Sequence, residues 1–512
     1  MSVQSSSQIL RRVITASSLG TLIEWYDFYI FGSLAVLIGK HLFPTDSGAS
    51  ALINTLAIFA AGFIVRPFGA LVFGRLGDLV GRKYTFLLTL ILMGGSTFAI
   101  GIIPGYATIG YAAPILVLLM RLLQGLALGG EYGGAATYVS EHAPAHRRGF
   151  FTSWIQTTAT LGLFLSLGVI LLTRKLMGDE QFNEWGWRIP FIVSILLVLV
   201  SIYIRMKMSE SPAFAKLKKE GKVSANPLKE SFSNRRNFKM VLLALFGAVM
   251  GQGVVWYTGQ FYAQSFIENV CRIDFEQSRT ILIWAILFAT PFFIVFGSLS
   301  DRIGRKWIMM GGMLLAVVSY RPIYSYFLSA SDVKSKTEIA GQRSVTRSAV
   351  YHAATNDSTI TTTTLSAYTD GTKMKEVKKE TPQAGIAGKS VKPEIKTEKT
   401  LPGTTYWIFV LLVFVQIIFV TMVYGPIAAF LVELFPTRIR YSSMSLPYHI
   451  GNGVFGGLVP FLGTLIVSFT ITDKNPAGDP LAGLWYPIGV ASLCLIIGMV
   501  FLSNKRDENV MD

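Results

Sequence analysis

Gly-Arg-Leu-Gly-Asp-Leu-Val-Gly-Arg-Lys, at Gly74 to Lys83, lies between two long apolar runs, and the pattern returns at Gly297 to Lys306 as Gly-Ser-Leu-Ser-Asp-Arg-Ile-Gly-Arg-Lys. Glycine permits a very short turn between antiparallel helices, and an Arg-Lys pair crosses a bilayer only at high cost. Each copy is therefore predicted to be a tight hairpin that joins two membrane spans on the cytoplasmic side. The copies begin almost half the chain apart, so we expect two similar halves, which in a membrane protein is typical of a transporter.

The composition of the chain is that of a membrane protein. Of its 512 residues, 51% are hydrophobic and 15% are charged, which is too apolar and too charge-poor for a soluble protein. The net charge of +16 arises from basic residues placed between apolar runs, and this distribution argues against a nucleic-acid partner. The two cysteines, Cys271 and Cys494, supply neither a disulfide framework nor a metal site, so we expect no bound metal.

Twelve apolar runs are each long enough, at about 20 residues, to cross a bilayer. They lie near 14–38, 51–73, 84–104, 111–134, 150–172, 188–206, 239–265, 280–300, 307–329, 405–430, 443–469 and 484–503. This predicts an all-α polytopic membrane protein with twelve transmembrane helices in two pseudo-symmetric six-helix bundles. The first half covers 1–208, a linker covers 209–238, and the second half covers 239–512.

Basic residues gather on one side of these predicted spans. They are Arg11-Arg12, Arg82-Lys83, Arg147-Arg148, Arg302, Arg305-Lys306, Arg438, Arg440, Lys505-Arg506 and those of the central segment Arg205 to Lys239. The positive-inside rule therefore places both termini and the linker in the cytoplasm, with the protein in the inner (plasma) membrane.

A polar segment at 330–402 interrupts the second half. The parity of the spans places this segment on the external side of the membrane, opposite the cytoplasm. It is rich in Ser, Thr and Lys, contains Thr361 to Thr364, and has no apolar periodicity. We therefore expect it to be disordered or loosely ordered. A docking segment or an external lid is the functional alternative.

Ionisable residues within the spans of the first half are candidate functional residues, because charges inside a membrane are costly. Glu24 and Asp27 share one face of the first predicted span. Arg66 lies in the second, and the fourth carries Arg121, Gln124 and Glu131 on one stripe.

The depth of these residues predicts which charges meet. We expect Asp27 to pair with Arg121, and Arg66 to pair with Glu24 or Glu131. The alternative is that such ion pairs only fix the positions of the helices.

The second half is polar without being charged. Trp256, Tyr257 and Gln260 in its first span, and Tyr448, His449 and Asn452 in its fifth, are expected to line a substrate cavity. Tight packing between spans is the alternative reading of these aromatic and amide side chains. A lone histidine such as His449 is more often a packing residue than a titrating one.

Several further motifs complete the pattern. They are Arg121-x-x-Gln-Gly, Glu24-Trp-Tyr-Asp-Phe-Tyr, Val65-Arg-Pro-Phe-Gly, Gly129-Gly-Glu-Tyr-Gly-Gly-Ala, Trp185-Gly-Trp-Arg-Ile-Pro-Phe, Glu210-Ser-Pro-Ala-Phe and Glu433-Leu-Phe-Pro-Thr-Arg-Ile-Arg. With these motifs and its twelve spans, the chain resembles the major facilitator superfamily. Within it, the chain is similar to the metabolite:proton symporters, whose members carry proline and betaine, 2-oxoglutarate, citrate or shikimate.

The resemblance implies transport by alternating access, driven by a proton gradient without a cofactor. It implies a role in proton coupling for Asp27 and Arg121, with Glu24 as the competing carboxylate. It also implies that the hairpins close the cytoplasmic side. The residues expected to form this gate are Gly74, Asp78, Gly81, Arg82, Asp301 and Arg305. Leu79 stands where the hairpin motif usually has Arg or Lys.

The sequence therefore predicts a symporter, functional as a monomer in the bilayer, that imports a small carboxylate-bearing metabolite with protons. Organic acids, betaines and amino acids are the substrate classes considered. The predicted substrate-binding residues are Arg66, Gln124, Glu131, Trp256, Tyr257, Gln260, Tyr448, His449 and Asn452. The alternatives are a proton-driven exporter or antiporter of amphipathic compounds and a transporter-like sensor. A membrane enzyme is not expected, because no His, Cys and Asp grouping has ligand spacing.

Overall fold

The structure is a computed structural model that describes residues 6–44, 48–207, 210–352, 357–380, 394–473, 475 and 478–504. In this part of the chain, nine helices are long and apolar enough to cross a membrane, and the bent pair α1 and α2 forms a tenth span. The long helices α3 and α16 complete the twelve spans predicted from the sequence. The predicted fold class is confirmed.

The first half contains six spans. Their helices are α1 (Ser6–Ser33) with α2 (Ala35–Leu42), α3 (Gly48–Leu79), α4 (Arg82–Ile102), α6 (Ala112–His142), α7 (Arg148–Met177) and α9 (Ile189–Met206). Short elements join them: α5 (Tyr106–Ile109), η1 (Ala145–Arg147), α8 (Asp179–Glu184) and η2 (Gly186–Arg188). Helix α3 packs against α6, α1 against α7, and α4 against α6 and α9, which gives a compact bundle.

The second half repeats the arrangement. Its first span runs through α12 (Arg235–Ala244), η3 (Leu245–Val249), α13 (Met250–Tyr257), η4 (Thr258–Tyr262), α14 (Ala263–Ser265) and η5 (Phe266–Val270). The others are α15 (Phe275–Ile303), α16 (Arg305–Ser331), α17 (Gly403–Tyr424) with α18 (Ile427–Leu434), α19 (Arg440–His449) with η7 (Ile450–Gly456) and α20 (Val459–Phe469), and η8 (Ala482–Leu484) with α21 (Trp485–Phe501). The segments η3, η4, η5 and η7 are π-helical turns.

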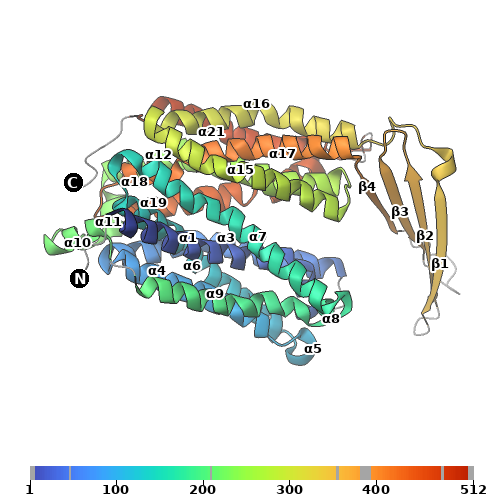
Figure 1. Cartoon of the computed structure of the whole chain (residues 1–512), viewed down its shortest axis with the longest axis horizontal. Helices are drawn as coiled ribbons and strands as arrows, with labels where there is room; N and C mark the ends of the chain where they lie inside the picture. Colours follow the sequence, from blue (N-terminus) through green and yellow to red (C-terminus); the bar gives the residue numbers. More distant parts are fainter. Residues whose placement is uncertain are drawn as a thin grey trace.

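The two halves meet along two helix pairs, α7 with α15 and α3 with α19 (Figure 1). We call the end of the molecule that carries the two hairpins, Gly74–Lys83 and Gly297–Lys306, the hairpin end. The linker helices α10 (Pro212–Lys219) and α11 (Pro227–Ser233) lie at this same end (Figure 1). Lys505 and Arg506, expected here as well, lie outside the described residues.

The prediction that 330–402 is disordered is wrong for the described part of that segment. It forms an antiparallel sheet in the order β1-β2-β3-β4, with strands at Ser344–His352, Asp357–Ala367, Lys373–Glu380 and Glu394–Thr400. The physical reason is strand propensity in β1 and β2, where β-branched Thr, Val and Ile recur, including the run Thr361–Thr364. Strands β3 and β4 are rich in Lys and Glu and are held in the sheet by their pairing with β2 and with each other. Apolar period-2 alternation is absent from the sequence because most described side chains of the sheet remain partly or fully exposed.

The sheet stands clear of the helices at the end opposite the hairpins, which we call the sheet end (Figure 1). It is attached to the second half through β4. Lys399 donates from its backbone nitrogen to the carbonyl of Arg272 (2.7 Å), and its own carbonyl accepts from the nitrogen of Asp274 (2.8 Å). The side chain of Gln277 bonds both the nitrogen and the carbonyl of Leu401 (2.7 and 2.9 Å). The sheet is therefore fixed to the second half by these hydrogen bonds.

Candidate functional site

A small cavity lies between the two halves, in the middle of the molecule. We call it the central cavity. Its lining residues are Thr21, Glu24, Trp25, Arg66, Leu128, Tyr132, Trp256, Tyr257, Tyr424, Tyr448, His449 and Asn452. Its free volume is about 30 Å³, far below the roughly 300 Å³ of the smallest ordinary ligand pockets. A metabolite therefore enters this cavity only if the halves move apart.

Seven residues singled out in the sequence line this cavity: Glu24, Arg66, Trp256, Tyr257, Tyr448, His449 and Asn452. The sequence reasoning missed Thr21, Trp25, Leu128, Tyr132 and Tyr424. Tyr132 follows Glu131 in the glycine-rich part of α6. An aromatic residue among glycines is the sequence feature that could have identified Tyr132 as a cavity residue.

Arg66 lies among aromatic rings in the wall of the cavity. The centre of its guanidinium is 4.2 Å from the ring centroid of Phe63 and 5.2 Å from that of Phe28. The hydroxyl of Tyr257 also contacts it, while its Nε has no hydrogen-bond partner among the described residues. Oε2 of Glu24, in the same cavity, likewise has none there. The structure thus brings Arg66 and Glu24 to one cavity without a close ion pair between them.

Glu131 pairs with a basic residue that the sequence analysis placed at the end of the sixth span, where the basic central segment begins. Its carboxylate forms an ion pair with Arg205 at the end of α9 and accepts a hydrogen bond from the hydroxyl of Thr89 (2.7 Å). The Arg205 guanidinium lies against Gly20, where a methyl group would not fit. Glu131 therefore pairs with Arg205 and not with Arg66, the partner expected from the sequence. This pairing is possible because Gly20 on α1 leaves room for the buried side chain of Arg205 from α9.

Asp27 and Arg121 do not meet directly. Asp27 is fully buried, and neither of its carboxylate oxygens has a hydrogen-bond partner among the described residues. Arg121 donates to Oε1 of Gln124 (2.8 Å), and Nε2 of Gln124 donates to the hydroxyl of Thr97 (2.7 Å). That hydroxyl adjoins Asp27 but donates to the carbonyl of Met93 (3.0 Å), so it can accept from Asp27 only if Asp27 carries a proton.

Tyrosines from both halves close the middle of the cavity. Tyr132 of α6 stacks on Tyr448 of α19, with ring centroids 3.6 Å apart. The hydroxyls of Tyr448 and Tyr424 are 2.8 Å apart, and the hydroxyl of Tyr132 accepts from Gln156 (2.7 Å). The stack of Tyr132 on Tyr448 joins the halves, and the two hydrogen bonds, one within each half, involve hydroxyls that can exchange a protein partner for a substrate.

Amides and a histidine occupy the wall formed by the second half. The side chains of Gln252 and Asn452 exchange two hydrogen bonds (3.0 and 2.9 Å). His449 is buried, and neither of its ring nitrogens makes a hydrogen bond of good geometry with a described group. His449 is thus unlike a satisfied packing histidine.

A second cavity of about 330 Å³ lies toward the sheet end, and we call it the outer pocket. Its lining residues are Phe28, Tyr29, Gly32, Ser33, Leu163, Gln260, Phe261, Gln264, Ser265, Glu268, Asn269, Arg279 and Leu282. Gln260 is the predicted substrate-binding residue that lies here instead of in the central cavity. An aromatic layer separates the two cavities, with Trp25 against Trp256 (centroids 5.5 Å apart) and Tyr29 against Phe261 (6.2 Å).

The first hairpin binds the second half at the hairpin end. The carboxylate of Asp78 accepts hydrogen bonds from the nitrogen (2.9 Å) and the hydroxyl (2.8 Å) of Ser442, in the first turn of α19. Arg82 pairs with Asp78 (3.1 Å) and donates to the carbonyl of Thr437 (2.9 Å). Gly74 lies against the backbone of Ser442, where no side chain fits without a shift. Gly81 makes the turn at a φ of 138°.

The second hairpin repeats these contacts in the opposite direction. The carboxylate of Asp301 accepts from the backbone nitrogens of Gly149 (2.9 Å) and Phe150 (2.8 Å), in the first turn of α7. Arg305 pairs with Asp301 (2.6 Å) and with Glu433 (2.9 Å). Each half therefore places an aspartate on the helix N-terminus of the other, where a negative charge is stabilised. All six gate residues predicted from the sequence lie in this closed interface.

Two acidic residues of the hairpin end were missed in the sequence. Glu141 of α6 accepts from Arg440 of the second half (3.1 Å) and from the hydroxyl of Ser211. Glu210 accepts from the backbone nitrogens of Arg82 and Lys83 (3.1 and 3.3 Å), which ties the linker to the first hairpin. Glu210 is the first residue of the motif Glu210-Ser-Pro-Ala-Phe. Its contact with the first hairpin joins residues more than a hundred positions apart, so the motif alone does not show it.

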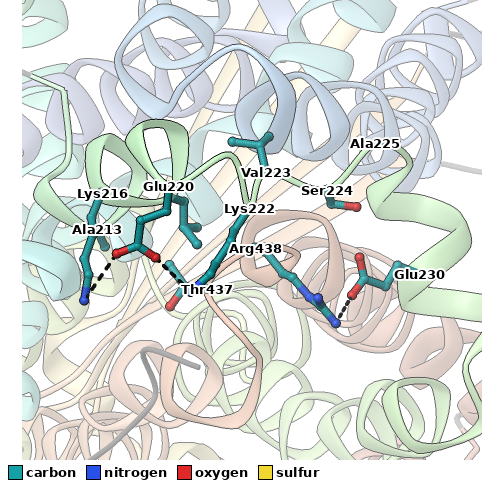
Figure 2. A pocket seen from close by; sticks show the side chains of 11 residues that line it. Ala213, Lys216, Glu220, Lys222, Val223, Ser224, Ala225, Glu230, Thr437 and Arg438 are labelled. Atoms are coloured by element: carbon teal, nitrogen blue, oxygen red, sulfur yellow. Dashed lines mark ion pairs between the residues drawn. The ribbon is translucent and has the colours of Figure 1, made fainter.

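A further cavity, of about 630 Å³, lies between the linker and the loop before α19 (Figure 2). Its ion pairs join Lys222 to Glu220 (3.0 Å) and Arg438 to Glu230 (2.5 Å). The cations are more than half exposed, so these pairs contribute little to stability. This cavity belongs to the linker surface and not to a path between the halves.

Comparisons with known proteins agree with this architecture. The sequence matches the family described as "Sugar (and other) transporter" over residues 13–228. A "Putative metabolite transport protein" of Haemophilus influenzae is 32% identical over 511 residues, which cover 99% of this chain and 97% of the relative. The "Alpha-ketoglutarate permease" of Escherichia coli is 36% identical over 329 residues, covering 64% of this chain and 74% of the relative.

The "Proline/betaine transporter" of Salmonella typhimurium is 38% identical over 316 residues, covering 60% of this chain; the match spans 63% of that relative, less than two thirds of its length. Among solved structures, the proton:xylose symporter XylE bound to 6-bromo-6-deoxy-D-glucose has the same fold, with a TM-score of 0.67 at 16% identity and 99% of each chain covered. These families are transporters and not enzymes. The chain belongs to the major facilitator superfamily and, within it, to the metabolite:proton symporter family.

Proposed function

We propose that this protein imports a small carboxylate-bearing metabolite together with protons, by alternating access to the central cavity. The observation that carries the proposal is Arg66, a buried guanidinium in the wall of a cavity formed by both halves, with its Nε unbonded to any described group. Guanidinium binds carboxylate through two parallel hydrogen bonds, so a carboxylate is the group that Arg66 would bind best. Trp256, Tyr257 and Tyr448 would enclose the remainder of a small substrate.

Proton coupling is assigned to Asp27, with Glu24 as the competing site. A buried carboxylate without hydrogen bonds is costly as an ion but not as an acid, which supports a protonated Asp27 in this conformation. The chain through Thr97 and Gln124 gives Arg121 a way to respond to the protonation state of Asp27. Substrate binding at the cavity and proton binding at Asp27 would then both act on the first half.

The hairpin end is proposed to face the cytoplasm, because the basic residues of the hairpins and the linker gather there. In this orientation the structure is closed toward the cytoplasm, and the sheet lies outside. Opening toward the cytoplasm requires the bonds of Asp78 and Asp301 to the opposite half to break. We further propose that a single chain is the functional unit, because both cavities are formed within it.

The experiment that tests this function is uptake into proteoliposomes under an imposed pH gradient, with a panel of labelled organic acids, betaines, amino acids and sugars. We expect uphill accumulation of at least one carboxylate-bearing compound, abolished by a protonophore. Accumulation of a sugar without competition by any carboxylate would contradict the substrate class. Proton-driven efflux instead of accumulation would support the exporter alternative.

A further inference from the structure

We propose that the outer pocket is an entry site that binds a zwitterionic solute, with Arg279 taking its carboxylate and Glu268 its cationic group. This inference rests on the proposed function and narrows its substrate class to compounds that carry both charges. The pocket has a free volume of about 330 Å³, enough for a small metabolite, whereas the central cavity has about 30 Å³. In this conformation, therefore, the outer pocket is the one of these two cavities that can accept a substrate.

A polar ladder leads from the outer pocket toward the central cavity. Gln260, Gln264 and Glu268 follow one another every four residues along the first span of the second half, and all three line the outer pocket. One step further along the same spacing is Trp256, which lines the central cavity. The span passes through the π turns η4 and η5 here, and π turns are frequent at functional sites. A solute bound at the ladder is thus placed on the path to the central cavity.

The two charges of the pocket form a long ion pair that is not a hydrogen bond. Nη2 of Arg279 is 3.6 Å from Oε2 of Glu268, and both side chains are partly exposed, at 33% and 25%. Arg279 stays positioned without this contact, because its Nε and Nη1 donate to the side-chain oxygen of Gln264 (2.8 and 3.0 Å) and its guanidinium packs on Phe275 (4.5 Å). A zwitterion can satisfy both charges at once, whereas a simple anion would meet repulsion from Glu268.

Aromatic rings complete the site on the side of the first half. Phe28, Tyr29 and Phe261 line the same pocket, and Tyr29 stacks on Phe261. Aromatic faces attract cations, and this attraction is strong for a quaternary ammonium, which cannot donate hydrogen bonds. Tyr29 and Phe261 also belong to the aromatic layer between the two cavities, so displacing them by a bound cation would open the path inward. Zwitterions with a trimethylammonium group are therefore the compounds that this site fits best.

The test measures occupancy of the outer pocket without relying on transport. Ser33, which lines the pocket, is replaced in Ser33→Cys, and the rate of its modification by a membrane-impermeant maleimide is followed in proteoliposomes; the native Cys271 and Cys494 are buried. We expect glycine betaine or proline to slow modification, and 2-oxoglutarate not to. When Glu268→Gln or Arg279→Gln is added, the solute concentration needed for the same protection should rise roughly tenfold. This is the change expected for the loss of a charged hydrogen bond.

The matched control is Arg174→Gln, which removes an exposed ion pair with Asp179 from the same end of the molecule and should leave protection unchanged. Modification that no zwitterion slows, or protection that persists in both Glu268→Gln and Arg279→Gln, would overturn the inference. Transport by the wild type without protection would refute the entry site alone. Protection without any transport would support the site and refute the proposed function.

Discussion

Arg121 and Asp27 are connected through Gln124 and Thr97 and not by a direct ion pair. Arg121 donates to Gln124 (2.8 Å), Gln124 donates to Thr97 (2.7 Å), and the hydroxyl of Thr97 adjoins the buried carboxyl of Asp27. A direct pair would hold Asp27 ionised. A chain of neutral groups leaves it free to bind a proton and still links it to a fixed cation.

This connection predicts that Gln124→Leu separates transport from coupling. Leucine removes an acceptor of Arg121 and the amide that donates to Thr97, and weakening such a buried polar network costs about 1–3 kcal/mol. We expect substrate exchange to continue at a reduced rate while accumulation under a pH gradient falls steeply. Exchange and accumulation measured in the same proteoliposomes check this prediction. An equal loss of both would indicate that Gln124 only supports the fold.

The ion pair of Glu131 with Arg205 predicts a stability effect. Glu131→Gln leaves Arg205 as an uncompensated buried charge, which typically costs about 3–5 kcal/mol. We expect a clear decrease in the thermal unfolding midpoint in detergent. The double variant Glu131→Gln/Arg205→Met should recover most of the loss, because it removes both charges. If the double variant is no more stable than the single one, the two residues are not partners.

The paired hairpin contacts predict that Asp78→Ala and Asp301→Ala open the hairpin end. Each removes two hydrogen bonds to a helix N-terminus of the other half, with a cost of about 1–3 kcal/mol. The readout is modification of Ser445→Cys, a buried residue of α19, from the hairpin side. We expect faster modification in either variant and the fastest in the double variant. Unchanged modification in all three would contradict the assignment of a gate.

The position of the sheet, outside the helix bundle, predicts that transport does not require it. Replacing residues 340–396 with a short Gly-Ser linker keeps the bonds of Lys399 to the loop before α15 and those of Leu401 to Gln277 in α15. Loop closure costs little and changes slowly with length, so we expect insertion and uptake within about twofold of the wild type. A correctly inserted variant without uptake would show that the sheet acts as a lid or a docking module.

The twelve spans and the two hairpins could be predicted because their signals are local. A run of about twenty apolar residues identifies a span without reference to the rest of the chain. A glycine-containing turn followed by Arg-Lys, as at Gly74–Lys83, identifies a hairpin in the same way. The residues of the central cavity were found where a polar or aromatic side chain interrupts an apolar run. Trp256 and Tyr448 are examples.

The remaining features depend on contacts that no local pattern encodes. Arg205 looks like the first basic residue of the linker, and only the packing of Gly20 against it shows that it is buried. The strands of the sheet lack apolar alternation because most of their described side chains remain partly or fully exposed. The chain from Arg121 to Asp27 depends on a threonine of α4 that was not considered.

The central claim, that Asp27 carries the coupled proton, is tested most directly by Asp27→Asn in proteoliposomes, beside Glu24→Gln and the exposed control Asp179→Asn. An imposed difference of one pH unit can drive about tenfold accumulation for each coupled proton. We expect the wild type and Asp179→Asn to concentrate substrate under this gradient, and Asp27→Asn to exchange substrate down its gradient without concentrating it. An Asp27→Asn variant that still concentrates substrate at the wild-type ratio would contradict the account. Loss of accumulation in Glu24→Gln alone would move the proton site to Glu24.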